Sequence, residues 1–112
     1  MSDTRPTISS RDRKVAEMIR DRKGFKTYGS FSAQSTLDAG LGNWDSGKLY
    51  GEDLESFREQ CRLIDYVVYS YSTPIAWYSQ EYGWYVARGK WSLTTSHHQG
   101  KLYLIPQPTL DI

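Results

Sequence analysis

The first regular pattern of apolar positions predicts a helix over residues 10–23. Its apolar side chains recur with the i, i+3, i+4 spacing of one helix face, at Val15, Met18 and Ile19. Ser9 or Ser10 is suited to cap the first turn, because a short hydroxyl accepts a hydrogen bond from a free backbone amide there. Gly24 follows the last turn, where a residue in the left-handed conformation is expected.

A second helical pattern covers residues 51–61. Its apolar positions also follow helical spacing, at Leu54, Phe57 and Cys61. Glu52 and Asp53 fall in the first turn, where the helix dipole favours negative charge. We interpret Cys61 as a small buried hydrophobe rather than a reactive thiol.

The stretch between these helices, residues 24–50, keeps neither a helical nor an alternating period. Glycines interrupt short polar runs, at Gly24, Gly29, Gly40, Gly42 and Gly47. Such punctuation predicts loops with at most brief extended pieces. Apolar side chains are available to anchor these loops, namely Phe25, Tyr28, Phe31, Leu37, Leu41 and Trp44.

From residue 66 the pattern becomes β-branched and aromatic, which predicts strands. Three strands are expected, over residues 66–71, 74–78 and 84–88, with a fourth short extended piece over residues 91–95. Connections this short force neighbouring strands to be antiparallel, which gives a meander. Alternation along the first strand places Tyr66, Val68 and Ser70 on one face, with Val67, Tyr69 and Tyr71 on the other.

The last element is predicted as a short helix over residues 97–104. Ser96 and Gln99 match a capping box, in which the serine caps the helix and the glutamine reaches back to the serine amide. Pro106 ends the helix. An extended alternative, with Leu102 and Leu104 in a strand, stays open.

These elements predict one α+β domain over residues 1–112, with residues 1–9 and 106–112 as flexible tails. Its architecture is a three- to four-stranded antiparallel meander packed against two helices, with a short C-terminal helix. A chain of 112 residues is long enough for one hydrophobic core and too short for two. Four Trp, nine Tyr and three Phe make that core rich in aromatic side chains.

Charge is nearly balanced, with a formal net charge of +1, but it is unevenly placed. Residues 1–26 hold eight Lys or Arg against four acids, whereas residues 27–65 hold three against seven. We expect the two segments to compensate each other within the fold. The single cysteine excludes an intramolecular disulfide, and no apolar run approaches the roughly 18 residues of a membrane span, so a cytoplasmic protein is expected.

Exposed aromatic side chains of the meander are the first candidate binding surface. Helices are expected to cover one face of this small sheet, which leaves part of the aromatic set free for a protein partner or a second copy of the chain. The candidates for protein binding are Tyr69, Tyr71, Tyr78, Tyr82, Trp84 and Tyr85.

Two other kinds of site receive weaker support. Nucleic-acid binding would use the basic N-terminal helix, through Arg11, Arg13, Lys14, Arg20 and Lys23. Asp12, Glu17 and Asp21 are interspersed with these basic residues, and they favour a solvated, salt-bridged surface instead. His97 and His98 follow three hydroxyl residues, but this spacing aligns no nucleophile with a base, so we expect one histidine at the core edge and one in solvent. Neither a metal site nor a cofactor is indicated.

Two segments carry a resemblance to a known family. Residues 66–77 read Tyr-Val-Val-Tyr-Ser-Tyr-Ser-Thr-Pro-Ile-Ala-Trp, and residues 91–99 read Trp-Ser-Leu-Thr-Thr-Ser-His-His-Gln, with Trp84 between them. The chain resembles, over about residues 25–100, a domain of unknown function that is common in small proteins of bacteriophages infecting Actinobacteria. Residues 87–89 depart from the Pro-Asp turn frequent in that family, and Pro106 shortens the family's C-terminal helix. The role of the last element therefore stays open.

The resemblance implies a phage-encoded accessory protein that acts inside the infected bacterial cell, and it brings no catalytic residues. Our leading interpretation is a non-enzymatic protein that binds a host or phage macromolecule, above all a protein, for host takeover or counter-defence. The first alternative is a small nucleic-acid-binding protein, and the second is a small hydrolase or nuclease that uses His97 or His98.

Overall fold

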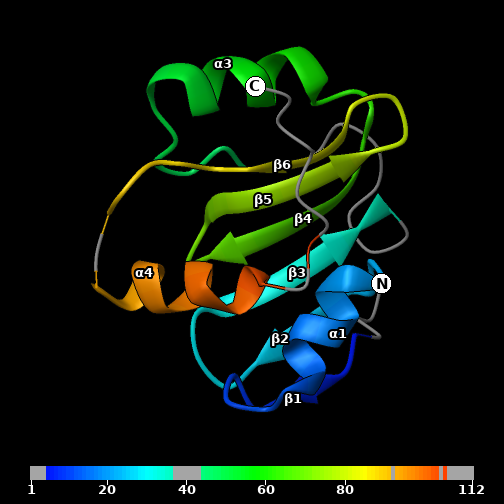
Figure 1. The fold of residues 1–112 in the computed structure, drawn as a ribbon, viewed down its shortest axis with the longest axis vertical. Coiled ribbons are helices and arrows are strands. Elements are labelled where there is room, and N and C mark those ends of the chain that lie inside the picture. Colours follow the sequence, from blue (N-terminus) through cyan, green and yellow to red (C-terminus); the bar gives the residue numbers. More distant parts are fainter. Residues whose placement is uncertain (1–4, 37–43, 92, 104, 106–112) are drawn as a thin grey trace.

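The computed structural model describes residues 5–36, 44–91, 93–103 and 105, which form an α+β fold (Figure 1). Three α-helices and a six-stranded mixed sheet are present among these residues. The strands are β1 (Thr7–Ile8), β2 (Phe25–Thr27), β3 (Phe31–Ser35), β4 (Ile64–Ser70), β5 (Thr73–Ser79) and β6 (Gly83–Val86). The helices are α1 (Lys14–Arg20), α3 (Gly51–Gln60) and α4 (Leu93–Gln99), followed by a 3-10 turn, η1 (Gly100–Leu102).

The strands lie in the sheet in sequence order, from β1 to β6. All neighbours are antiparallel except β1 and β2, which are parallel and connected through α1. The predicted meander is therefore confirmed for β4, β5 and β6. It is part of a larger sheet.

The prediction of loops with at most brief extended pieces over residues 24–50 is confirmed only in part, because two short strands there, β2 and β3, extend the sheet on the β4 side. Five residues of β3 pair with β4, from Phe31 opposite Ser70 to Ser35 opposite Tyr66. Phe25, Phe31 and Ala33 are completely buried, while the strand residues between them, Lys26, Thr27 and Ser32, are partly accessible. Strands of three and five residues are too short to show a sustained alternation of apolar and polar residues in the sequence. They are stabilised instead by pairing with a neighbouring strand.

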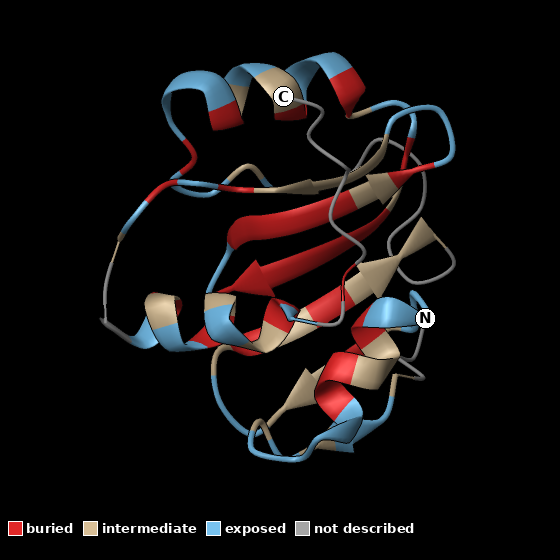
Figure 2. Cartoon of the chain, viewed as in Figure 1, coloured by how far each residue is buried: buried red, intermediate tan, exposed pale blue. Residues whose placement is uncertain are grey.

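Both faces of the sheet are covered, not one as the sequence suggested. On one face, Val15 and Ile19 of α1 pack with a core that includes Tyr66 and Val68. On the other face, Phe57 of α3 packs with a second core whose strand residues are Ile64, Val67, Tyr69 and Trp77. The alternation predicted along β4 is confirmed, and Figure 2 shows the buried central strands between the helical layers.

The helix at residues 51–61 is confirmed, with Cys61 at its C-terminal cap position, but α1 is shorter than predicted. Its N-cap residue is Arg13, so neither Ser9 nor Ser10 caps it. Asp12 instead accepts a hydrogen bond from the Lys14 amide at 2.9 Å. After the helix, Arg22 adopts the left-handed conformation expected of Gly24, with φ 56°.

The C-terminal element also differs from the prediction. The extended piece predicted over residues 91–95 is wrong for residues 93–95, because α4 already begins at Leu93 and places Ser96 inside the helix. The predicted cap by Ser96 and Gln99 is therefore wrong. The Gln99 amide instead donates to the carbonyls of Ala87 and Gly89, at 3.4 and 3.0 Å. The helical alternative holds up to Gln99 and continues as η1, while Leu104, the tail 106–112 and residues 1–4 lie outside the described residues.

Tyr71 provides a test of backbone strain in the two-residue turn between β4 and β5. Its φ of 57° lies in the left-handed region, which costs a non-glycine residue about 1–2 kcal/mol. We expect Tyr71→Gly to raise the free energy of unfolding by roughly 0.5–1 kcal/mol in urea denaturation. This gain is smaller than the strain because glycine also has greater conformational freedom in the unfolded chain. Tyr71→Ala truncates the same side chain without relieving the strain. A glycine variant no more stable than the alanine variant would contradict the argument.

Candidate functional site

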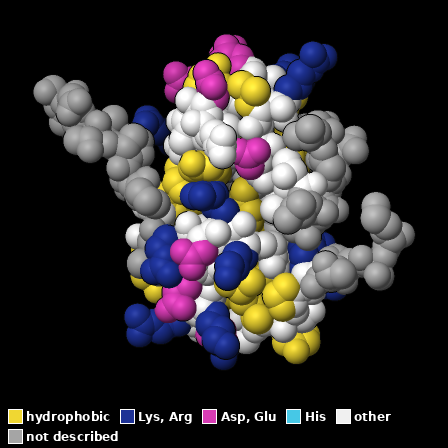
Figure 3. All heavy atoms as spheres, turned by 90° about the vertical axis from the view of Figure 1, so that its right-hand side faces the viewer, with side chains coloured by type: hydrophobic (Ala, Val, Ile, Leu, Met, Phe, Trp, Pro, Cys, Tyr) yellow, Lys and Arg dark blue, Asp and Glu magenta, His cyan; other side chains and the backbone are white. Residues whose placement is uncertain are grey.

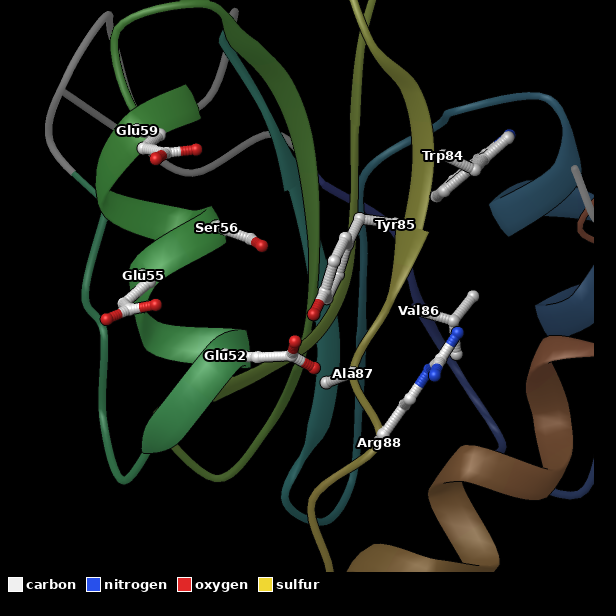
Figure 4. A pocket seen from close by; sticks show the side chains of 9 residues that line it. All are labelled: Glu52, Glu55, Ser56, Glu59, Trp84, Tyr85, Val86, Ala87 and Arg88. Atoms are coloured by element: carbon white, nitrogen blue, oxygen red, sulfur yellow. The ribbon is translucent and has the colours of Figure 1, made fainter.

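A groove of about 610 Å³ lies between α3 and β6 (Figure 4). Its α3 wall carries glutamates that recur along one helix face, at Glu52, Glu55 and Glu59. Its other wall is β6 and the residues that follow it, from Trp84 to Arg88. Its lining includes three glutamates and one arginine, so the groove is acidic.

No strand of the described residues pairs with the outer edge of β6, which is the last strand of the sheet. The Ala87 amide donates to the Ile75 carbonyl at 2.9 Å, which continues the pairing with β5. Alternation in an antiparallel ladder then directs the N–H and C=O groups of Trp84 and Val86 away from β5. The strand reads Gly-Trp-Tyr-Val and contains none of the charged or proline residues that normally block an edge. It can therefore pair with another strand.

The carboxylate of Asp53 fixes β6 and the following turn against α3. It accepts hydrogen bonds from the Tyr85 hydroxyl at 2.8 Å, the Gly89 amide at 2.8 Å and the Arg88 amide at 3.1 Å. Burial and the bond to Asp53 raise the pKa of Tyr85. The amides of Arg88 and Gly89 are thereby withdrawn from strand pairing, which explains why the sheet ends here. Sequence reasoning assigned Asp53 to the helix dipole and missed this role.

The six aromatic candidates for protein binding do not form one surface. Tyr85 projects from β6 towards α3, while Trp84 and Val86 lie on the other side of the strand (Figure 4). Tyr69 is buried, and burial raises its pKa to about 12. Tyr71 and Tyr82 are exposed, but they occupy turns at opposite ends of β5.

Tyr78 and Trp84 are half-buried and pack edge to face, with ring centroids 5.4 Å apart. The Arg22 guanidinium covers the Tyr78 ring at 4.2 Å from its centroid. Of the predicted set, Trp84 and Tyr85 line the groove.

His98 lies in a buried polar cluster that joins α4 to β4. Its Nδ1 is 2.7 Å from the Ser70 hydroxyl, which is also 3.0 Å from the Thr95 hydroxyl. The imidazole stacks on Phe31 with ring centroids 4.7 Å apart, and burial lowers the pKa of His98. His97 is exposed, so the expected division between core edge and solvent is confirmed.

The contact with Ser70 was missed because 28 positions separate the two residues. A signal was present nonetheless, since Ser70 is a polar residue on the face of β4 that carries Tyr66 and Val68. Such a position needs a hydrogen-bond partner. No carboxylate of the described residues hydrogen-bonds the His98 ring, and the Tyr71 amide beside Ser70 is bonded to the Ser30 carbonyl. The cluster thus lacks the third member and the adjacent free amide of a serine hydrolase.

The basic residues proposed for nucleic-acid binding are all exposed, but they do not share one helix face. Arg11 and Arg13 precede α1, and Lys23 follows it, while Lys14 and Arg20 stand at its two ends. Arg20 pairs with Asp21 at 3.0 Å, a hydrogen bond that raises the pKa of Arg20 and lowers that of Asp21. Figure 3 looks onto the side where α1 lies and shows acidic side chains among the basic ones.

The expected compensation between the basic and acidic segments does not occur through their helices, because α1 and α3 cover opposite faces of the sheet. Over the described ranges, no three His, Cys, Asp or Glu side chains are grouped to hold a metal ion. Within those ranges, every helix is too short or too polar to cross a membrane.

The chain belongs to a family of unknown function (DUF8033), which matches residues 8–104. No curated protein and no solved structure shows a significant match. The function must therefore be argued from the groove, the β6 edge and the chemistry of the cavities.

Removing the Asp53 carboxylate should destabilise the protein. Asp53→Ala leaves the Arg88 and Gly89 amides without their acceptor, and we expect a loss of about 2–4 kcal/mol in the free energy of unfolding. Asp53→Asn keeps one acceptor oxygen and should lose less. Glu55→Ala, on the exposed face of the same helix, should stay within about 0.5 kcal/mol of the wild type in urea denaturation. Equal losses in the Asp53→Ala and Glu55→Ala variants would contradict this role.

His98 should make stability depend on pH. Because its pKa is lower in the folded than in the unfolded chain, the unfolded state takes up the proton first. The contribution is complete above the ordinary pKa of 6.5 and is lost as pH falls below it towards the folded pKa.

We expect His98→Asn to lose less stability than the wild type between about pH 7.5 and pH 5 in thermal melts. The exposed His97→Asn variant should follow the wild type. An unchanged pH profile in His98→Asn would overturn the prediction.

Proposed function

We propose that this chain is a phage-encoded, non-enzymatic accessory protein that binds another protein in the cytoplasm of the bacterial host. The partner supplies an extended, basic segment that enters the groove between α3 and β6. The phage setting rests on the resemblance carried by residues 66–77 and 91–99. The observation that carries the binding mode is the open edge of β6 beside an acidic helix face.

Backbone pairing supplies the first part of the interaction. An added strand lies roughly 4.8 Å from β6 and bonds to the outward amide and carbonyl groups of Trp84 and Val86. These bonds give affinity without requiring a particular sequence in the partner. Asp53 holds β6 in place before the partner arrives, so little ordering of this chain is needed on binding.

Side chains supply the selectivity. Glu55 and Glu59 are exposed on α3, and they favour Lys or Arg at alternate positions of the incoming strand. Tyr85 is held between Asp53 and the Trp77 ring, on which it stacks with centroids 4.6 Å apart. Its fixed ring offers an apolar wall to the aliphatic stem of a lysine or arginine.

A second copy of the chain fits this edge less well than a basic partner. Antiparallel pairing of two β6 strands about a two-fold axis would bring the same surface of each copy together. The acidic faces of two α3 helices would then lie beside the same interface, where like charges repel. Charge therefore favours a heterologous basic segment over a homodimer at this site.

Titration with designed peptides tests the proposal. Isotope-labelled protein is followed by amide NMR while a peptide of alternating Val and Lys, about ten residues long, is added. We expect shifts at Trp84 and Val86 and along α3, with an affinity that falls as salt rises. A peptide of alternating Val and Glu should bind much more weakly.

Charge-reversal pairs provide matched controls. Glu55→Lys with Glu59→Lys should weaken binding of the Val–Lys peptide by about tenfold or more. Glu17→Lys with Asp21→Lys changes the net charge equally on α1, which covers the other face of the sheet, and should leave binding intact. Val86→Pro removes one outward amide at an edge position that tolerates proline, and it should also reduce binding. Equal binding of the acidic and basic peptides, or no shift at β6, would refute the proposal.

A further inference from the structure

A second cavity, of about 480 Å³, shares no lining residue with the groove. Residues from three parts of the sequence line it: Lys48, the turn between β4 and β5 with its two flanking residues, and the group Lys90, Trp91 and Thr95. The turn and residues 91–95 come from the two segments that carry the family resemblance. The fold thus brings these two segments together around one cavity.

The walls of this cavity are held in place by hydrogen bonds between the segments. The Lys48 amide donates to the Thr73 hydroxyl at 2.9 Å, and the Trp91 indole N–H donates to the Lys48 carbonyl at 2.9 Å. Gly47 packs so closely on the turn that a Cβ there would collide with the Ser72 carbonyl oxygen, and its φ is +49°. The cavity is therefore preformed.

The floor of the cavity is polar and fixed. Ser70 and Thr95 line it, both buried, and the Ser70 hydroxyl is held by His98 from behind. A buried cluster in which each hydroxyl has a partner keeps a single geometry. The cavity therefore presents hydroxyl groups at defined positions.

The rim and walls add two further kinds of group. Lys48 and Lys90 contribute two ammonium groups, and the described residues that line the cavity include no Asp or Glu. Trp91 is half-buried and Tyr71 is exposed beside it, so aromatic rings are available on the same cavity. Tyr71 keeps its bulky side chain at a backbone position that favours glycine, and strain of this kind concentrates at functional sites.

We propose that this cavity binds a phosphate-bearing ligand of the nucleotide class. The three terminal oxygens of a phosphate monoester accept hydrogen bonds from Lys48 and Lys90 and from the hydroxyl groups of Ser72 and Thr73, which also line the cavity. The planar base stacks against Trp91 or Tyr71, as bases do on aromatic side chains. The cavity volume falls within the range of small-molecule sites, about 300–1,000 Å³.

Calorimetric titration of the full chain with adenosine monophosphate tests this site, with adenosine and inorganic phosphate as separate arms. We expect the monophosphate to bind, and adenosine and inorganic phosphate each to bind at least about tenfold more weakly. Adenosine lacks the phosphate contacts, and inorganic phosphate lacks the stacking of the base. Lys48→Glu with Lys90→Glu should abolish measurable binding. Arg13→Glu with Lys14→Glu makes the same change in net charge on another surface and should leave binding unaltered. Trp91→Phe should retain binding of the monophosphate, because the ring can still stack, but the change in the protein's tryptophan fluorescence during the titration should differ from that of the wild type.

Three results would overturn the proposal: no binding of the monophosphate at millimolar concentration, equal losses in the two charge-reversal pairs, or equal affinity for inorganic phosphate and the monophosphate. The third result would refute the contribution of the ring. A short single-stranded oligonucleotide that binds while the monophosphate does not would also count against the site. Thermal melts of every variant show whether a loss reflects unfolding. Failure of peptide binding at β6 leaves these outcomes unchanged, since the two sites share no lining residue.

Discussion

Burial of the central strands on both faces is the constraint on which the structure depends. Val67 and Trp77 are completely buried on one side of the sheet, and Val68 and Ile75 on the other. Each such side chain stabilises the fold by roughly 1.5–3 kcal/mol relative to an exposed one, so neither face can be left open to water. The chain must therefore hold a helical layer against each face. The two edges of the sheet are then the only parts of it that no helix needs to cover.

Polar contacts as well as apolar ones join each helical layer to the sheet. Asp53 connects α3 to the backbone after β6, and His98 connects α4 to Ser70 of β4. These links lie on opposite faces, and a partner in each lines one of the two cavities that we interpret as binding sites: Tyr85, bonded to Asp53, lines the groove, and Ser70 lines the second cavity. Hydrophobic packing is non-directional, whereas these hydrogen bonds fix position. The same contacts that set the helices in place therefore also preform the groove and the second cavity.

What could be predicted from the sequence depended on whether a signal was local. The α3 helix and strands β4 to β6 have enough residues to show their period, and they were predicted within a few residues. The β2 and β3 strands were predicted only as brief extended pieces among loops, because β3 is stabilised by pairing with β4, which is distant in sequence, and β2 pairs with β3. The start of α4 was misplaced for a similar reason, since Asp53 and Lys48 bind the backbone and indole of residues 88–91.

The binding sites were less accessible to sequence reasoning than the fold. Trp84 and Tyr85 were identified as candidates by residue type, but neither the acidic wall of α3 nor the open edge of β6 could be assigned without the strand order. The contact between Ser70 and His98 could not be predicted because 28 positions separate the two residues in sequence, and only the fold brings them together. Residue type thus indicated which side chains to consider, while their grouping came from the fold.

The separation of charge follows from this same two-sided arrangement. The sheet lies between α1 and α3, so the basic N-terminal segment cannot neutralise the glutamates of α3 by direct contact between the helices. Arg20 instead pairs locally with Asp21, and the exposed carboxylates of Glu55 and Glu59 keep their field at the groove. That field acts over about 8 Å at physiological ionic strength, which is enough to orient a basic segment as it approaches β6. A nearly neutral chain can therefore present an acidic site at one edge of its sheet.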